Sequence, residues 1–255
     1  MILAYFAYVA AVAAVLLDNA LPSLAVALAA AAVVFLLPRV PPLVRDVAPL
    51  ALTLLAYRGM DLFKTLPHPH TLENSWIVHD RALLAWLRPA IESLGPIGPA
   101  YFEFCYLIVY AVSLYSLALL YRYGRHEKAP RLWFAYLAGT LGAYALFPYF
   151  PSDPPRVVFH GADNPQITTI FRTLNLAIVG NAGIHSSVFP SAHVSSAFAC
   201  AWGLRSTLPD KPWIWRIMTI YAASVAVATV YGRYHYAVDA LAGFAVSLVA
   251  LRRKA

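Results

Sequence analysis

Long runs of apolar residues restrict the fold of this sequence more than any other feature. About eight runs can be drawn, and each is close to the roughly 20 residues that a helix needs to cross a bilayer. Charged residues make up only 12% of the 255 residues, about half the share that a soluble domain carries. The sequence therefore predicts an all-α protein, a polytopic bundle of transmembrane helices. The expected spans are Ile2–Leu17, Leu21–Leu37, Val47–Leu66, Tyr101–Tyr121, Arg131–Tyr149, Val188–Arg205, Trp213–Tyr231 and Tyr236–Leu251.

The first hundred residues are predicted to hold N-terminal transmembrane helices and a surface segment. The run Ile2–Leu17 lacks the basic start of a signal peptide, and Leu21–Leu37 follows almost at once, so we expect a retained helical hairpin. The segment Pro67–Pro99 mixes charged residues with tryptophans, and we interpret it as a loop and an amphipathic helix lying on the surface. Residues 101–255 are then expected to form the membrane core that carries the chemistry.

Basic residues lie at the ends of the apolar runs, where they mark topology. This placement argues against nucleic-acid binding, despite a formal net charge of +7. With every cluster on the cytoplasmic side, Phe150–Ser187 and Tyr231–His235 fall together on the outer face. We therefore expect an integral protein of the cell inner or plasma membrane, with its active site on the non-cytoplasmic side. The clusters are Arg39 and Arg45; Arg122, Arg125, Lys128 and Arg131; Arg205, Lys211 and Arg216; and Arg252, Arg253 and Lys254.

Charged residues inside the apolar runs leave two questions open. Arg58, Asp61 and Lys64 interrupt the third run at positions i, i+3 and i+6, so neighbours can pair along a helix. We favour an internal ion-pair ladder; the alternative is a polar path in a non-enzymatic transporter. Glu103 lies near the outer end of the fourth run. Such a carboxylate either lines the site or lies at the interface, and we favour the interface.

Three polar stretches fall on the expected outer face, namely Pro151–Arg156, Phe189–His193 and Tyr231–Asp239. In the last of them, His235 and Asp239 are four residues apart, so on a helix the carboxylate can reach the imidazole. A carboxylate that accepts a hydrogen bond from one ring nitrogen fixes the tautomer and leaves the other nitrogen free to attack. Alone, such a pair could equally be structural.

The other polar residues of these stretches favour phosphate chemistry. His193 supplies a second imidazole as a proton donor, and Ser191, at a helix start, supplies donors for an anion. Arg156 and Arg233 supply the positive charge that a transferring phosphoryl group needs. Each also has a structural alternative, because Ser191 could cap a helix and the arginines could face headgroups. The candidates are His193, His235 and Asp239 for catalysis, and Ser191, Arg156 and Arg233 for phosphate binding.

A metal site is the alternative for His193, His235 and Asp239, because two histidines and a carboxylate are common ligands. The tight HExxH pair of zinc hydrolases is absent from the sequence. A serine and two arginines also suit a phosphate better than a metal. We therefore expect neither a metal nor another cofactor.

At these residues the chain resembles the type-2 phosphatidic acid phosphatase superfamily, over roughly Tyr101–Leu251. Pro190–His193 (PSAH) matches its Pro-Ser-x-His motif, and His235–Asp239 (HYAVD) matches the end of its third motif. The resemblance implies a membrane core of six helices, with His235 as a nucleophile that forms a phosphohistidine and Asp239 as its orienting partner. It also implies that His193 protonates the leaving alcohol and then activates the acceptor, and that Ser191 holds phosphate oxygens.

Two departures from the family motifs narrow the resemblance. The usual first motif is absent, and Pro154–Arg156 stands in its place. The usual third-motif arginine falls on Thr229, and Arg233, one helical turn later, could replace it if the stretch is helical. Both departures resemble the branch that contains inositol phosphorylceramide synthase. This implies a lipid phosphotransferase with a phospholipid donor and a lipid alcohol or water as acceptor. The alternative is a phosphatase of the phosphatidic acid or polyprenyl phosphate type.

Overall fold

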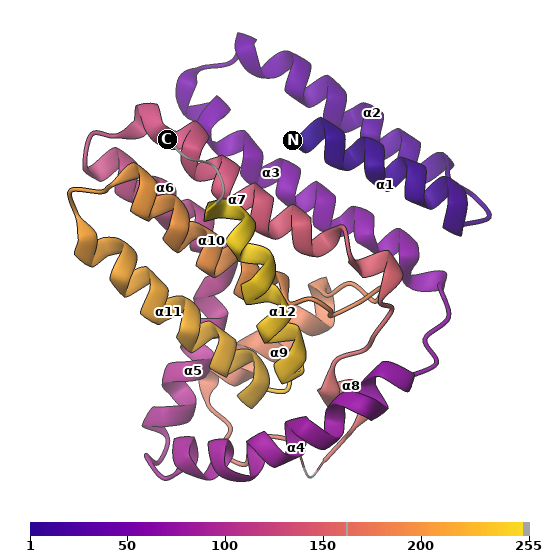
Figure 1. Ribbon diagram of the computed structural model, residues 1–255, viewed down its shortest axis with the longest axis vertical. Coiled ribbons are helices and arrows are strands. Elements are labelled where there is room, and N and C mark those ends of the chain that lie inside the picture. Colours follow the sequence, from indigo (N-terminus) through magenta and orange to yellow (C-terminus); the bar gives the residue numbers. More distant parts are fainter. Residues whose placement is uncertain (162, 252–255) are drawn as a thin grey trace.

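The computed structural model describes residues 1–161 and 163–251, and within these ranges its regular elements are all helices (Figure 1). The all-α class predicted from the apolar runs is confirmed. The α-helices are α1 (Ile2–Leu16), α2 (Leu21–Leu36), α3 (Pro42–Met60), α4 (Thr71–Glu92), α5 (Ile97–Ile108), α6 (Val112–Arg122), α7 (Ala129–Tyr144), α8 (Pro155–Val158), α9 (Ile170–Ala182), α10 (Ala192–Thr207), α11 (Pro212–Tyr231) and α12 (Ala237–Ser247).

Every expected span coincides with a helix, but the structure refines several of them. Among the described residues, Leu21–Arg39, Ile97–Arg122 and Pro212–Tyr231 are long and apolar enough to cross a membrane, and α1 and Ala237–Leu251 are shorter apolar helices. The fourth span is interrupted by a 3₁₀ turn between α5 and α6. Helix α9 lies inside the long segment expected on the outer face and packs against α5, and the sequence pattern did not predict it.

Helix α10 lies at the centre of the bundle and contacts α6, α7, α11 and α12. Small residues allow this packing, because an added Cβ at Gly139 of α7 would lie 2.7 Å from the Cβ of Ala199. The same applies at Gly203, where a Cβ would lie 2.8 Å from Leu132. A helix that is apolar on all sides must be surrounded by protein or lipid. The first residues of α10 are thereby held firmly at one end of the core.

The basic turns gather at one end of the bundle (Figure 1). The Nζ of Lys128 donates to the Thr207 carbonyl oxygen at 3.1 Å, which joins the α6–α7 turn to the end of α10. The Tyr121 hydroxyl donates to Asp46 at 2.8 Å, which joins the same end of α6 to the start of α3. The basic cluster at Arg252, Arg253 and Lys254 lies outside the described residues.

Helix α4 lies across the opposite end of the bundle (Figure 1) and is amphipathic, as expected of the Pro67–Pro99 segment. Its buried residues share one face because they are spaced three, four or seven apart. They are Glu73, Ile77, Asp80, Leu84 and Ile91. Two of the five are carboxylates, so the inner face of α4 brings negative charge to this end of the molecule.

The third expected span does not contain the full ion-pair ladder predicted for Arg58, Asp61 and Lys64. Helix α3 ends at Met60, and a 3₁₀ turn over Asp61–Thr65 follows. Asp61 and Lys64 do form an ion pair, with 3.2 Å between Oδ2 and Nζ. Arg58 is exposed and its guanidinium lies over the ring of Tyr57. The ladder is therefore confirmed only for its second step.

Candidate active site

A tight turn between α11 and α12 presents His235. The Thr229 carbonyl oxygen accepts hydrogen bonds from the backbone N–H groups of Tyr234 and His235, at 2.9 and 3.0 Å. Arg233 has a φ of 62°, in the left-handed region that a non-glycine residue rarely adopts. Arg233 therefore lies in the turn beyond α11. To replace the third-motif arginine as predicted, Arg233 would have to continue that helix, and it does not.

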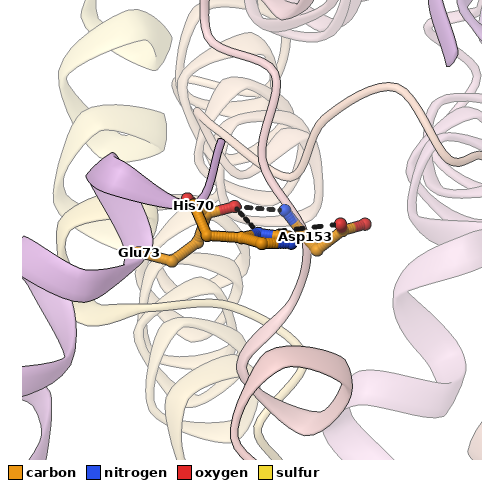
Figure 2. A group of neighbouring side chains, drawn as sticks. All are labelled: His70, Glu73 and Asp153. Carbon is orange, nitrogen blue, oxygen red and sulfur yellow. Dashed lines mark hydrogen bonds and ion pairs between the residues drawn. The ribbon is translucent and has the colours of Figure 1, made fainter. Parts of the chain in front are cut away.

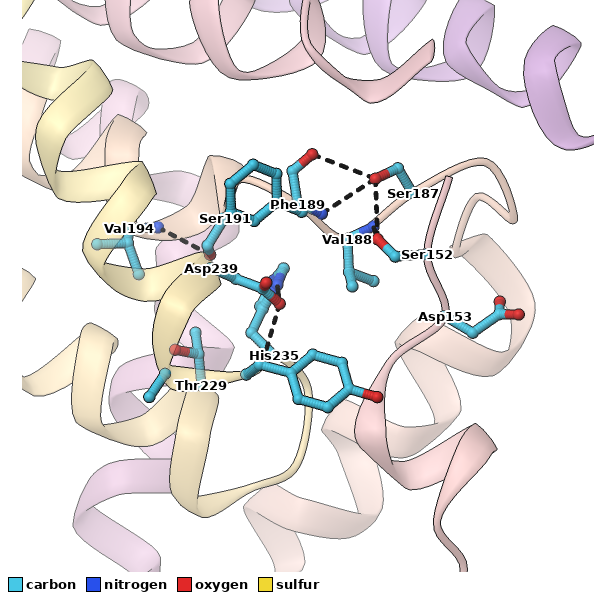
Figure 3. Close-up of polar contacts among 12 residues, drawn as sticks. Ser152, Asp153, Ser187, Val188, Phe189, Ser191, Val194, Thr229, His235 and Asp239 are labelled. Atoms are coloured by element: carbon cyan, nitrogen blue, oxygen red, sulfur yellow. Dashed lines mark hydrogen bonds and ion pairs between the residues drawn. The ribbon is translucent and has the colours of Figure 1, made fainter. Parts of the chain in front are cut away.

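His235 and Asp239 face each other at the start of α12 (Figure 3). The His235 Nδ1 lies 3.3 Å from the Asp239 Oδ2, and both side chains are buried. The same Oδ2 accepts a hydrogen bond from the Tyr236 backbone N–H at 2.9 Å, so the carboxylate is held in place from the helix start. A carboxylate fixed beside Nδ1 favours the tautomer in which Nε2 carries the lone pair.

The environment of His235 keeps its imidazole neutral. Burial lowers the pKa of His235 to about 3, and the positive charge of Arg156 acts in the same direction. A hydrogen bond to the backbone of Val188 acts in the opposite direction but does not offset burial. Because the neutral ring is the nucleophilic form, His235 is in its reactive state at any physiological pH.

His193 lies beside His235, with 5.8 Å between the ring centroids. Its ring stacks on Tyr106 at 5.0 Å and meets Tyr110 edge-on at 5.1 Å. Tyr106 in turn stacks on Tyr234, with centroids 3.9 Å apart. Aromatic rings from α5 and the following 3₁₀ turn thus hold the second imidazole at the entrance of α10.

Ser191 connects the start of α10, which carries His193, to the start of α12, which follows His235. It is fully buried, and its hydroxyl caps α10 by accepting from the Val194 backbone N–H at 3.4 Å (Figure 3). Its own backbone N–H donates to the Asp239 carbonyl oxygen at 2.9 Å. A Cβ at Gly243 would lie 2.4 Å from the Ser191 carbonyl oxygen, so only glycine allows α12 to approach this closely.

A cavity of about 260 Å³ opens in front of the two histidines. Its lining includes His193, His235 and Arg156, and most of the other lining side chains are aromatic or aliphatic. None of the described residues that line it is an aspartate or a glutamate. Tyrosines are prominent among these residues, namely Tyr57, Tyr106, Tyr110, Tyr136, Tyr144 and Tyr234. Such a cavity suits an anionic head attached to an apolar tail.

The two candidate arginines lie in different surroundings. Arg156, at the start of α8, lines the cavity, and its backbone N–H donates to the Arg233 carbonyl oxygen at 3.2 Å. Arg233 is fully buried, forms an ion pair with Asp80 of α4 and does not line the cavity. The structure therefore brings together His193, His235, Asp239 and Arg156. It places Arg233 outside the cavity lining, paired with Asp80.

Asp80 is the residue near the site that sequence reasoning missed. Besides pairing with Arg233, it accepts a hydrogen bond from the Ala237 backbone N–H at 2.7 Å and so holds the first turn of α12. The two residues of the ion pair are 153 positions apart. A lone aspartate in an amphipathic helix carries no signal of such a partner.

Glu103 is buried, so the preference for an interfacial position was wrong. One of its carboxylate oxygens accepts from Arg172 at 2.8 Å, and the other accepts from Asn175 at 2.8 Å and from the Tyr234 hydroxyl at 2.7 Å. Arg172 also donates to the Gly232 carbonyl oxygen at 3.2 Å. This cluster anchors the turn that carries His235, and its charged members, Glu103 and Arg172, do not line the cavity.

A second polar group fixes the loop that leads to Arg156 and α8. Glu73 accepts hydrogen bonds from the Asp153 backbone N–H at 2.8 Å and from His70 Nδ1 at 3.2 Å (Figure 2). The ligand-type atoms of His70, Glu73 and Asp153 lie within 4.8 Å of one another, a spacing that a metal ion could use. Hydrogen bonds within the group already account for the arrangement, so we interpret it as a clamp between α4 and the loop.

The sequence of the chain is similar to that of known proteins of one superfamily. The model of the PAP2 superfamily matches residues 75–252 of the chain. A PA-phosphatase related-family protein of Dictyostelium discoideum is 34% identical over 107 residues, which cover 40% of this chain and 19% of that protein. No solved structure matches at a significant level. Because the family match spans well over half of the sequence and contains the whole histidine site, the chain belongs to the PAP2 superfamily.

Proposed function

We propose that this chain is an integral membrane phosphotransferase that moves a phosphoryl headgroup from a phospholipid to a lipid alcohol through a phosphohistidine at His235. Membership of the PAP2 superfamily already indicates an enzyme of lipid phosphate chemistry rather than a transporter. One observation carries the finer proposal. His235, oriented by Asp239 and beside His193, lines a cavity together with Arg156, and most of the other lining side chains are aromatic or aliphatic.

The residues support a two-step displacement. In the first step the Nε2 of His235 attacks phosphorus, the bond from phosphorus to the leaving lipid oxygen breaks, and His193 gives that oxygen a proton. In the second step the acceptor hydroxyl gives its proton to His193 and attacks the phosphohistidine, which restores His235. Arg156 stabilises the negative charge of the transferring group. The proposal needs no metal ion.

The departures from the family motifs support a lipid alcohol as the acceptor. Thr229 occupies the position of the usual third-motif arginine, and it is fully buried beneath the turn, where its hydroxyl donates to the Ala226 carbonyl oxygen at 2.8 Å. Arg156 stands where the first motif is expected. This pattern resembles the inositol phosphorylceramide synthase branch. The second candidate, a lipid phosphatase with water as acceptor, is favoured by the printed name of the Dictyostelium relative.

The arrangement of charges supports an active site on the non-cytoplasmic side. The basic turns meet at the end of the bundle opposite the histidines, and positive loops normally stay in the cytoplasm. In sealed vesicles of known orientation, we expect turnover only of lipid supplied to the leaflet that corresponds to the outside of the cell. Turnover only from the opposite leaflet would reverse this assignment.

Purified protein with labelled phosphatidylinositol and a short-chain ceramide tests the reaction. We expect a new phosphodiester lipid, a labelled protein adduct with the acid lability of a phosphohistidine, and loss of both in His235→Ala and His193→Ala. Folding of each variant is checked by its elution as a monodisperse species in detergent. Labelled phosphatidic acid, offered in parallel, tests the alternative: release of inorganic phosphate from it, with no lipid product from phosphatidylinositol, would show a phosphatase instead. Full activity of either histidine variant would overturn the mechanism.

A further inference from the structure

Helix α3 forms one wall of the catalytic cavity although it precedes the family match, which begins at residue 75. Its residues in the lining are Leu50, Thr53, Leu54, Tyr57 and Arg58. Leu54 is 60% exposed and Arg58 is exposed as well, so the cavity is open along this helix.

The same part of the chain is tied to the segment that leads into His193. The Tyr57 hydroxyl accepts from the Ile184 backbone N–H at 3.1 Å, and Asp61 accepts from the His185 backbone N–H at 3.0 Å. His68 Nε2 lies 3.1 Å from the Ser186 carbonyl oxygen. Three contacts over consecutive residues make α3 and the following turn a fixed component of the site.

Arg58 and Arg156 are the arginines in the cavity lining, and among the described residues neither forms an ion pair with a carboxylate. Their positions along the cavity differ. The guanidinium of Arg156 lies 5.5 Å from the centre of the Tyr234 ring, next to His235, whereas that of Arg58 lies 6.0 Å from the centre of the Tyr57 ring. Arg156 therefore lies beside the turn that carries His235, and Arg58 lies along α3, beside Tyr57.

We propose that Arg58 is a specificity residue that binds a second anionic group of the lipid substrate, beyond the phosphoryl group that reacts at His235. The inference rests on the proposed function, because it assumes that a lipid phosphate occupies the cavity. A guanidinium suits this task, since it stays charged and presents a planar set of donors to phosphate or carboxylate. The substrate class is then a lipid whose headgroup carries two anionic groups.

Two matched pairs of lipids test this assignment. The first pair is dioctanoyl phosphatidic acid and dioctanoylglycerol diphosphate, and the second is phosphatidylinositol and phosphatidylinositol 4-phosphate. Each pair differs by one phosphate. Consumption of the lipid is measured in detergent micelles that also contain a short-chain ceramide, so that water and a lipid alcohol are both offered as acceptors. For at least one pair, we expect the doubly anionic lipid to have a kcat/KM at least fivefold higher.

Arg58→Gln should remove this preference by raising KM for the doubly anionic lipid about tenfold, with kcat within twofold of wild type. Arg58→Lys should keep most of the preference because it retains the charge. Arg45→Gln is the matched control, since Arg45 is exposed on the first turn of the same helix and does not line the cavity. A change in kcat alone, or an equal loss for both members of a pair, would indicate a structural role and overturn the inference.

The outcomes also separate the inference from the proposed function. If wild type consumes these lipids but Arg58→Gln has the same preference, the inference fails and the function stands. The same holds if wild type prefers the singly anionic member of every pair that it consumes. If wild type consumes none of the four lipids, the proposed chemistry fails, and the role of Arg58 fails with it.

Discussion

Two pairs of arginines lie near His235, and they differ in whether a carboxylate pairs with them. Arg172 and Arg233 are buried and paired with Glu103 and Asp80. Arg58 and Arg156 line a cavity to which the described residues contribute no carboxylate. A buried charge must be compensated within the protein, whereas an uncompensated charge in a cavity is available to a ligand. The first pair therefore holds the site, and the second pair is suited to bind what enters it.

The largest effect on stability is expected when the buried ion pair of Asp80 and Arg233 is broken. Asp80→Asn keeps an acceptor for the Ala237 backbone N–H but leaves Arg233 buried without a countercharge. We expect a loss of about 3–5 kcal/mol in the free energy of unfolding in detergent, because breaking a buried pair from one side is strongly destabilising. The double variant Asp80→Asn with Arg233→Met should recover a large part of that loss. Equal stability of the single and double variants would contradict the structural role.

A large effect on catalysis, without loss of stability, is expected when Arg156 in the cavity is replaced. Arg156→Gln should lower kcat/KM about 10²–10³-fold, the range found when one preorganised donor to a transition state is removed. The unfolding midpoint should stay close to wild type, because Arg156 has no carboxylate partner among the described residues. Arg81→Gln is the control, since Arg81 forms an exposed ion pair with Asp163. If Arg156→Gln unfolds at a clearly lower temperature, the two pairs are not distinct.

The smallest effect is expected at the second buried pair. Glu103→Gln removes the charge but keeps one oxygen that can accept from Arg172, and its amide N–H can donate to the Tyr234 hydroxyl in place of the lost acceptor. Because Arg172 also donates to the Gly232 carbonyl oxygen, we expect a loss of about 1–3 kcal/mol in stability, less than at Asp80. The KM for lipid should change less than twofold, as measured on the same preparations. A large increase in KM would place Glu103 in substrate binding instead.

Much of the fold and part of the site could be predicted from the sequence. Each apolar run overlaps a helix of the structure, because a helix that crosses a bilayer must satisfy its backbone hydrogen bonds internally and present apolar side chains. Among the described residues, three helices are long and apolar enough to cross a membrane. The spacing of His235 and Asp239 predicted their contact, since four residues correspond to about one helical turn. Helix α9 was missed because it lies inside a segment that was interpreted only as an outer connection.

The roles of the charged residues could not be predicted in the same way. Periodicity shows which face of α4 carries Asp80, but not that Arg233 lies opposite it, 153 positions away. For Glu103, a lone carboxylate in an apolar run is compatible with the interface or with a buried pair, and only the position of α9 decides between them. Arg58 was paired with its neighbour Asp61 on spacing alone, whereas the structure turns it toward the cavity.

The sequence by itself determined an all-α membrane protein and the two motifs that supply His193, His235 and Asp239. Those features depend on local spacing and on the apolar character of each segment, which a linear pattern records. Only the tertiary structure decided that Arg156 and Arg58 share a cavity while Arg172 and Arg233 are neutralised behind it. The function of an arginine depends on whether a carboxylate from a distant segment reaches it, and that contact exists only once the helices have packed.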